Sequence, residues 1–291
     1  MNKKLWLYLV RRTNRLTNKE LRILLTLTRD YQQIKWNSTE VIKRLKLDNK
    51  RGHLFHIHYN EQLKQLEHIK ALFQQDSFIT IHDLAYPELL KKIYDPPAML
   101  FYCGNLQLLQ QNCIAFIGSR AANPVVLPIL DHLLPDLIKA NYVIVSGLAK
   151  GIDTWSHQRC IYHHGSTIAV LGNGLDYYYP KQNARLQKEI AKKHLLISEY
   201  PLQTKPHKYH FPLRNRIIAG LSRGVCVMQA GLKSGTEITA NLALEEGREV
   251  FAIPYAPNQA QFLGCNLLIQ EGAKLVIEAK DILETLAYSH H

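Results

Sequence analysis

The stretch Cys113-Ile-Ala-Phe-Ile-Gly-Ser-Arg120 joins a short apolar run to a loop that contains a glycine and a cation, and this pattern recurs along the rest of the chain. Stretches whose apolar residues have helical spacing separate the runs. The runs that we predict as strands are 114–117, 142–146, 167–171, 195–198, 225–229, 250–253 and 275–277. Continuous apolar strands that alternate with helices are typical of a parallel sheet covered on both faces. We therefore predict an α/β fold with a doubly wound, mostly parallel sheet.

The loops after the predicted strands combine glycine with hydroxyl or cationic side chains. In such sheets ligands bind beyond the carboxyl ends of the strands, where these loops meet. Glycine lets backbone N–H groups approach an anion closely, and helix N-termini add a favourable dipole. The loops supply Gly118, Ser119, Arg120, Lys150, Lys181, Lys208, Ser234 and Gly235. We predict phosphate binding along this edge, and the alternative is that the glycines serve only the turns.

Local signals predict where two of the following helices begin. Asn123 is expected as an N-cap with Pro124 at the first helical position. Ser234 and Glu237 have the spacing of a capping box. Neither Gly-x-Gly-x-x-Gly nor Gly-x-x-x-x-Gly-Lys-Ser/Thr occurs, so the usual fingerprints of NAD and ATP sites are missing and no cofactor is predicted.

The segment Phe211-Pro-Leu-Arg-Asn-Arg-Ile-Ile-Ala-Gly-Leu-Ser222 places polar residues ahead of an apolar run. Its spacing predicts that Arg214, Asn215 and Arg216 enter the first turn of a helix whose other face is buried. Two guanidinium groups beside free helix N–H groups suit phosphate. We predict that these residues and Phe211 form the basic wall of a groove. The alternative is that the arginines pair with nearby carboxylates.

Aromatic residues alternate with the basic residues of these loops: Tyr177, Tyr178, Tyr179, Tyr200, Tyr209 and Phe211. Aromatic faces that stack bases, beside cations that hold the backbone, are typical of surfaces that bind single-stranded nucleic acid. We therefore expect at least one of these rings to stack on a base. For any single tyrosine, packing beneath a loop is the more common role.

The charge of the chain also indicates a polyanionic partner. The formal net charge is +12, and residues 1–75 carry 16 Lys and Arg against 6 Asp and Glu. A second basic region, residues 181–216, carries 9 against 2. Contacts to phosphates dominate nucleic-acid affinity, although a basic protein without such a partner remains the alternative. The chain has no run of 18 uncharged apolar residues, so no transmembrane helix is predicted.

Length and composition suggest one large domain and a smaller one. Residues 1–75 contain no proline and have helical apolar spacing, which predicts a small all-α domain that is basic outside. Its start, 1–12, is expected as a helix and not as a signal peptide. Residues 76–112 are expected as a connector with a strand at 99–103, and residues 113–291 as the main domain. The five cysteines form no Cys-x-x-Cys pair, which favours reduced thiols in a cytoplasmic protein.

Histidine supplies the only metal-like pattern, His53-x-x-His56-x-His58. No Cys or carboxylate completes a ligand set at a familiar spacing, so no metal site is predicted.

Several ordered blocks between about residues 80 and 280 closely resemble the family of DNA-processing proteins called DprA or Smf. The blocks are Gly118-Ser-Arg120, Ser146-Gly-Leu-Ala-x-Gly-Ile-Asp153, Val170-Leu-Gly-x-Gly-Leu-Asp176, Ser198-Glu199, 211–222 and Ser234-Gly-Thr236. The resemblance implies an extended Rossmann-like domain, a SAM-like (sterile-alpha-motif) domain in residues 1–75 and no C-terminal winged-helix domain.

The resemblance further implies binding of single-stranded DNA without strong sequence preference. Members protect incoming strands during natural transformation, load the recombinase RecA and form homodimers through the Rossmann-like domain. No catalytic activity is implied. Carried over to this chain, the DNA site comprises Gly118, Ser119, Arg120, Lys181, Lys208, Phe211, Arg214, Asn215 and Arg216.

The chain departs from the family pattern at a few positions. Gln229 stands where the family usually has an acidic residue, and Tyr255 stands where it has glycine. Pro128 and Pro135 occur in the helix expected after Arg120, so that helix is expected to be short, kinked or interrupted.

Two other functions remain open. Nucleotide hydrolases of the lysine-decarboxylase-like class also use a Rossmann-like sheet with a Gly-Thr phosphate loop. Asp153, Asp176 and Glu199 could supply general acid–base groups at the strand ends. However, the double-glycine form of that loop is missing. A purely structural, dimerising scaffold is the third possibility, and the apolar segment around 262–269 is a candidate for its interface, although burial in the core explains that segment equally well.

Overall fold

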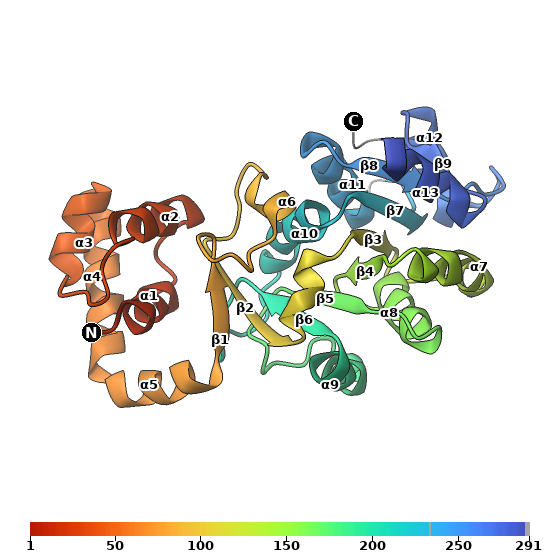
Figure 1. The fold of residues 1–291 in the computed structure, drawn as a ribbon. Helices are drawn as coiled ribbons and strands as arrows, with labels where there is room; N and C mark the ends of the chain where they lie inside the picture. Colours follow the sequence, from red (N-terminus) through yellow and green to blue (C-terminus); the bar gives the residue numbers. More distant parts are fainter. Residues whose placement is uncertain (233, 289–291) are drawn as a thin grey trace.

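A single mixed sheet organises the protein in the computed structural model, which describes residues 1–232 and 234–288. Within these residues the strand order is β1-β2-β6-β5-β4-β3-β7-β8-β9 (Figure 1). The strands are β1 Ser77–Thr80, β2 Met99–Gly104, β3 Cys113–Gly118, β4 Val143–Ser146, β5 Thr167–Leu171, β6 Leu195–Ser198, β7 Gly224–Gln229, β8 Glu249–Ala252 and β9 Lys274–Leu275. β2 pairs antiparallel with β1 and β6, and the remaining pairs are parallel. The predicted α/β class and mostly parallel sheet are confirmed.

Helices cover both faces of the sheet. Alternate residues of β3 enter separate cores, with Ile114 and Phe116 on one face and Ala115 and Ile117 on the other. The first face is covered by α7 Val126–Lys139, α8 Ile152–Tyr162, α9 Ala184–Lys193 and α13 Ala279–Tyr288. The second is covered by α6 Glu88–Lys91, α10 His210–Leu221, α11 Gly235–Glu245 and α12 Leu263–Gln270. Short 3₁₀ turns complete the fold: η1 Leu106–Gln110, η2 Lys181–Asn183 and η3 Ala260–Phe262.

The helix after β3 differs from its prediction. α7 runs without interruption for 14 residues although Pro135 lies inside it, so the expectation of a short or interrupted helix is wrong. Pro128 falls in the first turn, where backbone N–H groups have no partner within the helix. The helix also begins two residues after Pro124, because Asn123 accepts a hydrogen bond from the Val125 N–H at 3.0 Å and closes a turn first.

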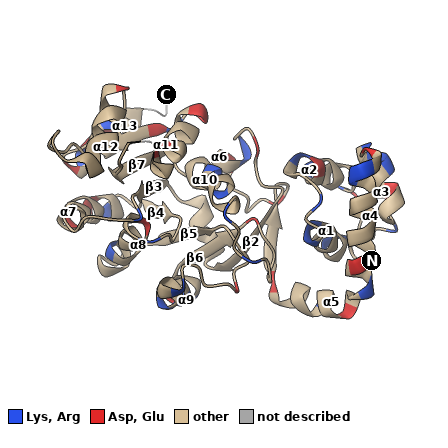
Figure 2. Ribbon diagram, turned by 180° about the vertical axis from the view of Figure 1, so that it is seen from behind, with Lys and Arg blue, Asp and Glu red and all other residues tan. Residues whose placement is uncertain are grey.

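Five helices form the N-terminal part, as the apolar spacing predicts (Figure 1). They are α1 Lys3–Arg12, α2 Asn18–Leu27, α3 Ser38–Leu45, α4 Asn49–Lys64 and α5 Leu66–Gln75. Thr17 begins α2 with a complete capping box to Glu20. Figure 2 shows Lys and Arg on several of these helices. Within residues 76–112, β1 and β2 join the main sheet, and β1 was not predicted. The division into three parts stays a prediction.

Arginines of α1 hold the N-terminal helices against the sheet domain. Arg11 donates to the Glu199 carbonyl from Nε at 3.2 Å and from Nη2 at 2.8 Å, and Arg12 donates to the Leu202 carbonyl at 2.8 Å. Arg22 of α2 adds an ion pair with Asp95 at 2.9 Å. Guanidinium groups suit this role because several N–H donors lie in one plane, so that one arginine can make two hydrogen bonds at once.

Asp76 links the two parts through a buried carboxylate. It accepts hydrogen bonds from the Tyr8 hydroxyl at 3.0 Å and from the Leu202 N–H at 2.8 Å. Burial raises the pKa of Asp76 from 3.8 to about 6. The folded protein therefore retains a proton that the unfolded chain releases. This contribution to stability is fully present below about pH 4 and is lost as the pH rises through about 6.

We expect Asp76→Asn to keep both hydrogen bonds and to abolish this pH dependence. Relative to the variant, the wild-type protein should lose about 3 kcal/mol of unfolding free energy between about pH 4 and pH 7. Urea denaturation at a series of pH values measures this difference. A difference that stays constant with pH would contradict the raised pKa.

Candidate nucleic-acid interface

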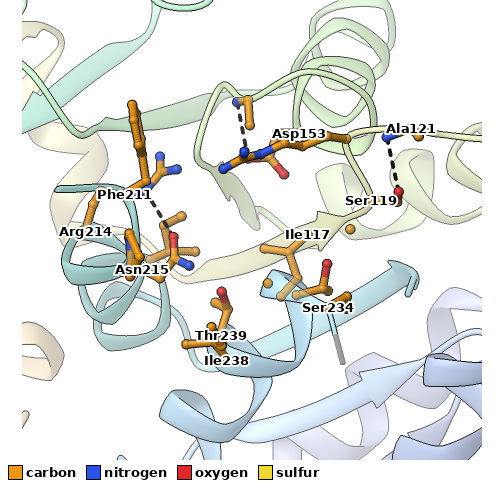
Figure 3. A pocket seen from close by; sticks show the side chains of 17 residues that line it. Ile117, Ser119, Ala121, Asp153, Phe211, Arg214, Asn215, Ser234, Ile238 and Thr239 are labelled. Carbon is orange, nitrogen blue, oxygen red and sulfur yellow. Dashed lines mark hydrogen bonds between the residues drawn. The ribbon is translucent and has the colours of Figure 1, made fainter. Parts of the chain in front are cut away.

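A cavity of about 470 Å³ lies beyond the carboxyl end of β3, between α8, α10 and α11 (Figure 3). Phe211, Arg214 and Asn215 approach it from α10, and Ser234, Ile238 and Thr239 approach it from the α11 side. The predicted site residues that line it are Gly118, Ser119, Arg120, Phe211, Arg214, Asn215, Ser234 and Gly235. The structure thus brings most of the predicted residues to one place, at the sheet edge where the loops were expected to meet.

The Gly118–Ser119–Arg120 loop is held rigidly by its backbone. Ser119 donates its N–H to the Gln229 carbonyl at 2.9 Å, and its own carbonyl accepts the Ile152 N–H at 3.1 Å. A Cβ on Gly118 would lie 2.6 Å from the Ile152 side chain. Gly151 has φ +75°, and a Cβ there would lie 2.3 Å from the Ser119 carbonyl oxygen. Both glycines are therefore required by close packing around this loop.

Arg120 lines the cavity with a charge that is available to a ligand. Its side chain is exposed, and among the described residues no hydrogen-bond or ion-pair partner approaches it. An exposed guanidinium beside a cavity can bind a phosphate with two parallel hydrogen bonds. Lys150, Lys181 and Lys208 are also exposed but do not line the cavity.

Arg214 is buried and mostly serves the protein itself. Only 5% of it is exposed, and its Nη1 donates to the carbonyl of Gly147, at 2.6 Å, and to that of Val170. A Cβ on Gly147 would lie 2.3 Å from Nη1, which explains the glycine. Burial lowers the pKa of Arg214 to about 10, opposed by the charge of Asp153, so the guanidinium stays protonated at neutral pH. Arg214 thus ties α10 to Gly147, which follows β4, and to the end of β5.

Arg216 faces away from the cavity. Its Nη2 lies 2.7 Å from Glu199 Oε1 and 3.6 Å from Asp95 Oδ2, and the residue is 9% exposed. It lines a second cavity of about 260 Å³ between α10 and the N-terminal helices. The prediction that Arg214 and Arg216 form one basic wall is wrong. For Arg216 the alternative of pairing with carboxylates is correct.

An aromatic pair borders the cavity. The Phe211 and Tyr179 rings are stacked, with centroids 5.1 Å apart and planes at 26°, and Tyr179 is 48% exposed. Lys181 follows two residues later in η2, so a cation lies next to the pair in the chain. Tyr200 is instead buried and stacks on His210 at 4.0 Å, which is the packing role expected for single tyrosines.

The start of α11 forms another wall of the cavity. Ser234 is the N-cap residue, but its buried hydroxyl makes no capping bond and has no hydrogen-bond partner among residues 1–232 and 234–288. The predicted capping box is wrong, because the Glu237 N–H bonds to the Ser234 carbonyl at 3.1 Å. A Cβ on Gly235 would meet nothing within 4 Å in the described part of the chain, so the space on that side of Gly235 is open. Thr236 and Thr239 line the cavity too, and their i, i+3 spacing on α11 places them on one face of that helix.

The three carboxylates considered for acid–base chemistry have structural partners. Asp153 accepts the N–H groups of Gly147, at 3.1 Å, and Ala149, at 3.3 Å, and burial raises its pKa. Asp176 accepts the Gln203 N–H at 2.9 Å and 3.1 Å. Glu199 pairs with Arg216, as described above.

The departure at Tyr255 is accommodated by packing. Its hydroxyl donates to the Met228 carbonyl at 2.6 Å and its ring stacks on Phe262 at 3.8 Å.

Two kinds of feature are absent within residues 1–232 and 234–288, namely clusters of metal ligands and helices that could span a membrane. No group of three His, Cys, Asp or Glu side chains there could hold a metal ion. None of the helices described there combines the length and apolar character of a membrane span.

Comparison with known proteins identifies close relatives. A family model described as DNA recombination-mediator protein A matches residues 77–287. DNA processing protein DprA of Streptococcus pneumoniae is 49% identical over 216 residues, which are 74% of this chain and 76% of the relative. DprA of Bacillus subtilis is 44% identical over 225 residues, 76% of each chain.

Solved structures give the same result. The X-ray structure of DprA from S. pneumoniae matches with a TM-score of 0.88 and 41% identity over 98% of both chains. DprA from Helicobacter pylori, whose structure concerns its single-stranded DNA binding mode, matches with a TM-score of 0.65 and 31% identity. That match covers 74% of this chain and 98% of the other.

Arg216→Met tests whether Arg216 is structural. The change leaves Glu199 buried without its partner, so the unfolding free energy should fall by about 3–5 kcal/mol. Affinity for a polyanion, measured where the variant is folded, should change less than about twofold, because Arg216 does not line the cavity. Arg120→Met, at an exposed position, should stay within about 0.5 kcal/mol of wild type. Denaturation and gel shift measure both quantities, and a stable Arg216→Met protein with lost affinity would reverse the assignment.

Proposed function

Because the chain belongs to the DprA (Smf) family of DNA recombination mediators, we propose that it binds single-stranded DNA along the edge that carries the 470 Å³ cavity. The observation that carries this proposal is the exposed Arg120, which has no partner among the described residues and lies on a hydrogen-bonded loop beside that cavity. The related protein from H. pylori, described by its single-stranded DNA binding mode, supports the ligand class.

The proposed contacts divide between phosphates and bases. Arg120, Ser119 and the open start of α11 at Gly235 hold phosphates inside the cavity. The exposed lysines, Lys150, Lys181 and Lys208, hold phosphates outside it. The Phe211–Tyr179 pair offers a ring face to a base. Arg214 and Arg216 are left out of direct contact, because both guanidinium groups are buried and Arg216 does not line the cavity.

We also propose that the protein protects incoming strands and loads RecA during natural transformation, in the cytoplasm. The description of the matched family as recombination mediators supports this role. No catalytic role and no cofactor are proposed, and the structural partners of Asp153, Asp176 and Glu199 disfavour a nucleotide hydrolase. We further propose that the chain divides into a helical domain (1–75), a connector (76–112) and a sheet domain (113–291). The start of the family match at residue 77 supports the first boundary.

Arg120→Ala combined with Lys181→Glu should weaken single-strand binding at least tenfold. The slope of log K against log salt should decrease by about 1.4, since each contact to a single strand contributes about 0.7. Fluorescence anisotropy with a labelled dT oligonucleotide at several salt concentrations measures both values.

A matched control applies the same charge change to exposed residues of the N-terminal part, Arg29→Ala in the turn after α2 with Lys50→Glu in α4. This control should affect binding only slightly. The proposal would be contradicted if the control lost as much affinity as the test variant while the salt slope of the test variant stayed unchanged. That result would place the DNA on the N-terminal helices.

A homodimer formed through the sheet domain is the proposed assembly. Leu267 of α12 is 43% exposed, whereas Phe262 and Leu268 are buried in the core, so only part of the predicted apolar segment is accessible. Mass measurement in solution should give twice the 33.5 kDa chain, and a larger complex with a dT oligonucleotide. Leu267→Glu should shift the mass towards the monomer. A monomer in the wild type would refute the dimer, and a dimer that never takes up the oligonucleotide would favour the scaffold.

A further inference from the structure

Gln229 is the last residue of β7 and is almost completely buried, with 1% of it exposed. Both ends of its side-chain amide bond to the loop that follows β3. Oε1 accepts the Asn123 N–H at 2.8 Å, and Nε2 donates to the Ala121 carbonyl at 3.3 Å. The backbone carbonyl of Gln229 also accepts the Ser119 N–H, so Gln229 makes three hydrogen bonds to this one loop.

These bonds lie on both sides of Arg120. Ser119 is fixed on the N-terminal side, and Ala121 is fixed on the C-terminal side. Ala121 also donates its N–H to the Ser119 hydroxyl at 3.1 Å, which closes the loop on itself. The backbone around Arg120 is therefore held, while its guanidinium has no partner among the described residues.

We infer that Gln229 is a positioning residue for Arg120: its amide holds residues 119–123 so that the Arg120 guanidinium and Ser119 face the cavity. This inference rests on the proposed function, in which Arg120 binds a DNA phosphate. A binding loop that is already held in its bound geometry loses less conformational entropy on binding, and the affinity is therefore higher.

In this chain the amide makes both bonds because its oxygen accepts while its nitrogen donates. Methionine has a similar length but would leave the Asn123 N–H and the Ala121 carbonyl without their partner. Glutamate would still accept from Asn123, but its carboxylate cannot donate to Ala121. Glutamine therefore makes both side-chain bonds, glutamate makes one and methionine makes neither.

The test is a cycle of Gln229→Met, Arg120→Ala and the double variant in the full chain. With Arg120 present, Gln229→Met should weaken binding of a dT oligonucleotide about five- to tenfold, within the usual range for coupled neighbours. In the Arg120→Ala protein the same change should have less than about a twofold effect, because the residue being positioned is gone. Gln229→Glu should lie between methionine and wild type.

Asn266→Leu is the matched control for lost side-chain bonds. The Asn266 amide likewise brackets one backbone segment, donating to the Tyr255 carbonyl at 2.9 Å and accepting the Tyr255 N–H at 3.0 Å. It lies on α12, and neither residue lines the cavity. This variant should lower the melting temperature, as Gln229→Met does, but leave DNA affinity unchanged.

Hydrogen exchange without DNA gives a readout independent of binding. The amides of Ser119, Ala121 and Asn123 should exchange at least about tenfold faster in Gln229→Met and at the wild-type rate in Asn266→Leu. Unchanged exchange and affinity in Gln229→Met would overturn the inference, as would an equal loss of affinity with and without Arg120. If Arg120→Ala alone binds as wild type, the proposed phosphate contact fails and the inference falls with it. A weakened Arg120→Ala protein with a normal Gln229→Met protein overturns only the inference.

Discussion

The buried guanidinium of Arg214 is the interaction on which the proposed binding edge depends. It reaches from α10 to the carbonyls of Gly147 and Val170, at the ends of two adjacent parallel strands, with Asp153 supplying the balancing charge. Strand ends in a parallel sheet leave carbonyl groups that no neighbouring strand satisfies, and a cation with several fixed donors can bond to two of them at once. The position of α10, and hence of Phe211 at its start, follows from this contact.

The opposite face of α10 is fixed to a different part of the chain. Arg216 meets Glu199 and Asp95, and Glu199 offers its carbonyl to Arg11 of α1. One short helix thus borders the cavity with one face and the N-terminal helices with the other. The basic residues of segment 211–222 divide between these two tasks, and Arg120 on the β3 loop lines the cavity without a partner in the described part of the chain.

Much of this arrangement could be predicted from the sequence, since buried parallel strands are continuous apolar runs and the loops after them must meet at one edge. β1 was missed because four residues at the edge of a sheet, paired antiparallel, leave little pattern. The wall of two arginines was predicted wrongly although the spacing argues against it: residues two apart on a helix point to nearly opposite sides. The hydrogen bonds of Gln229 to Ala121 and Asn123 join segments more than a hundred residues apart, and local pattern carries no signal for such contacts.

Because Gly147 and Arg214 lie in close contact, the residues that each position can tolerate depend on the other position. A side chain at residue 147 would occupy the space of the guanidinium, and a smaller residue at 214 would leave the carbonyls of Gly147 and Val170 without their donor. Replacing only one of the two residues therefore disturbs the packing or the hydrogen bonding at this edge of the sheet. The two positions, which are 67 apart in the sequence, therefore have to change together.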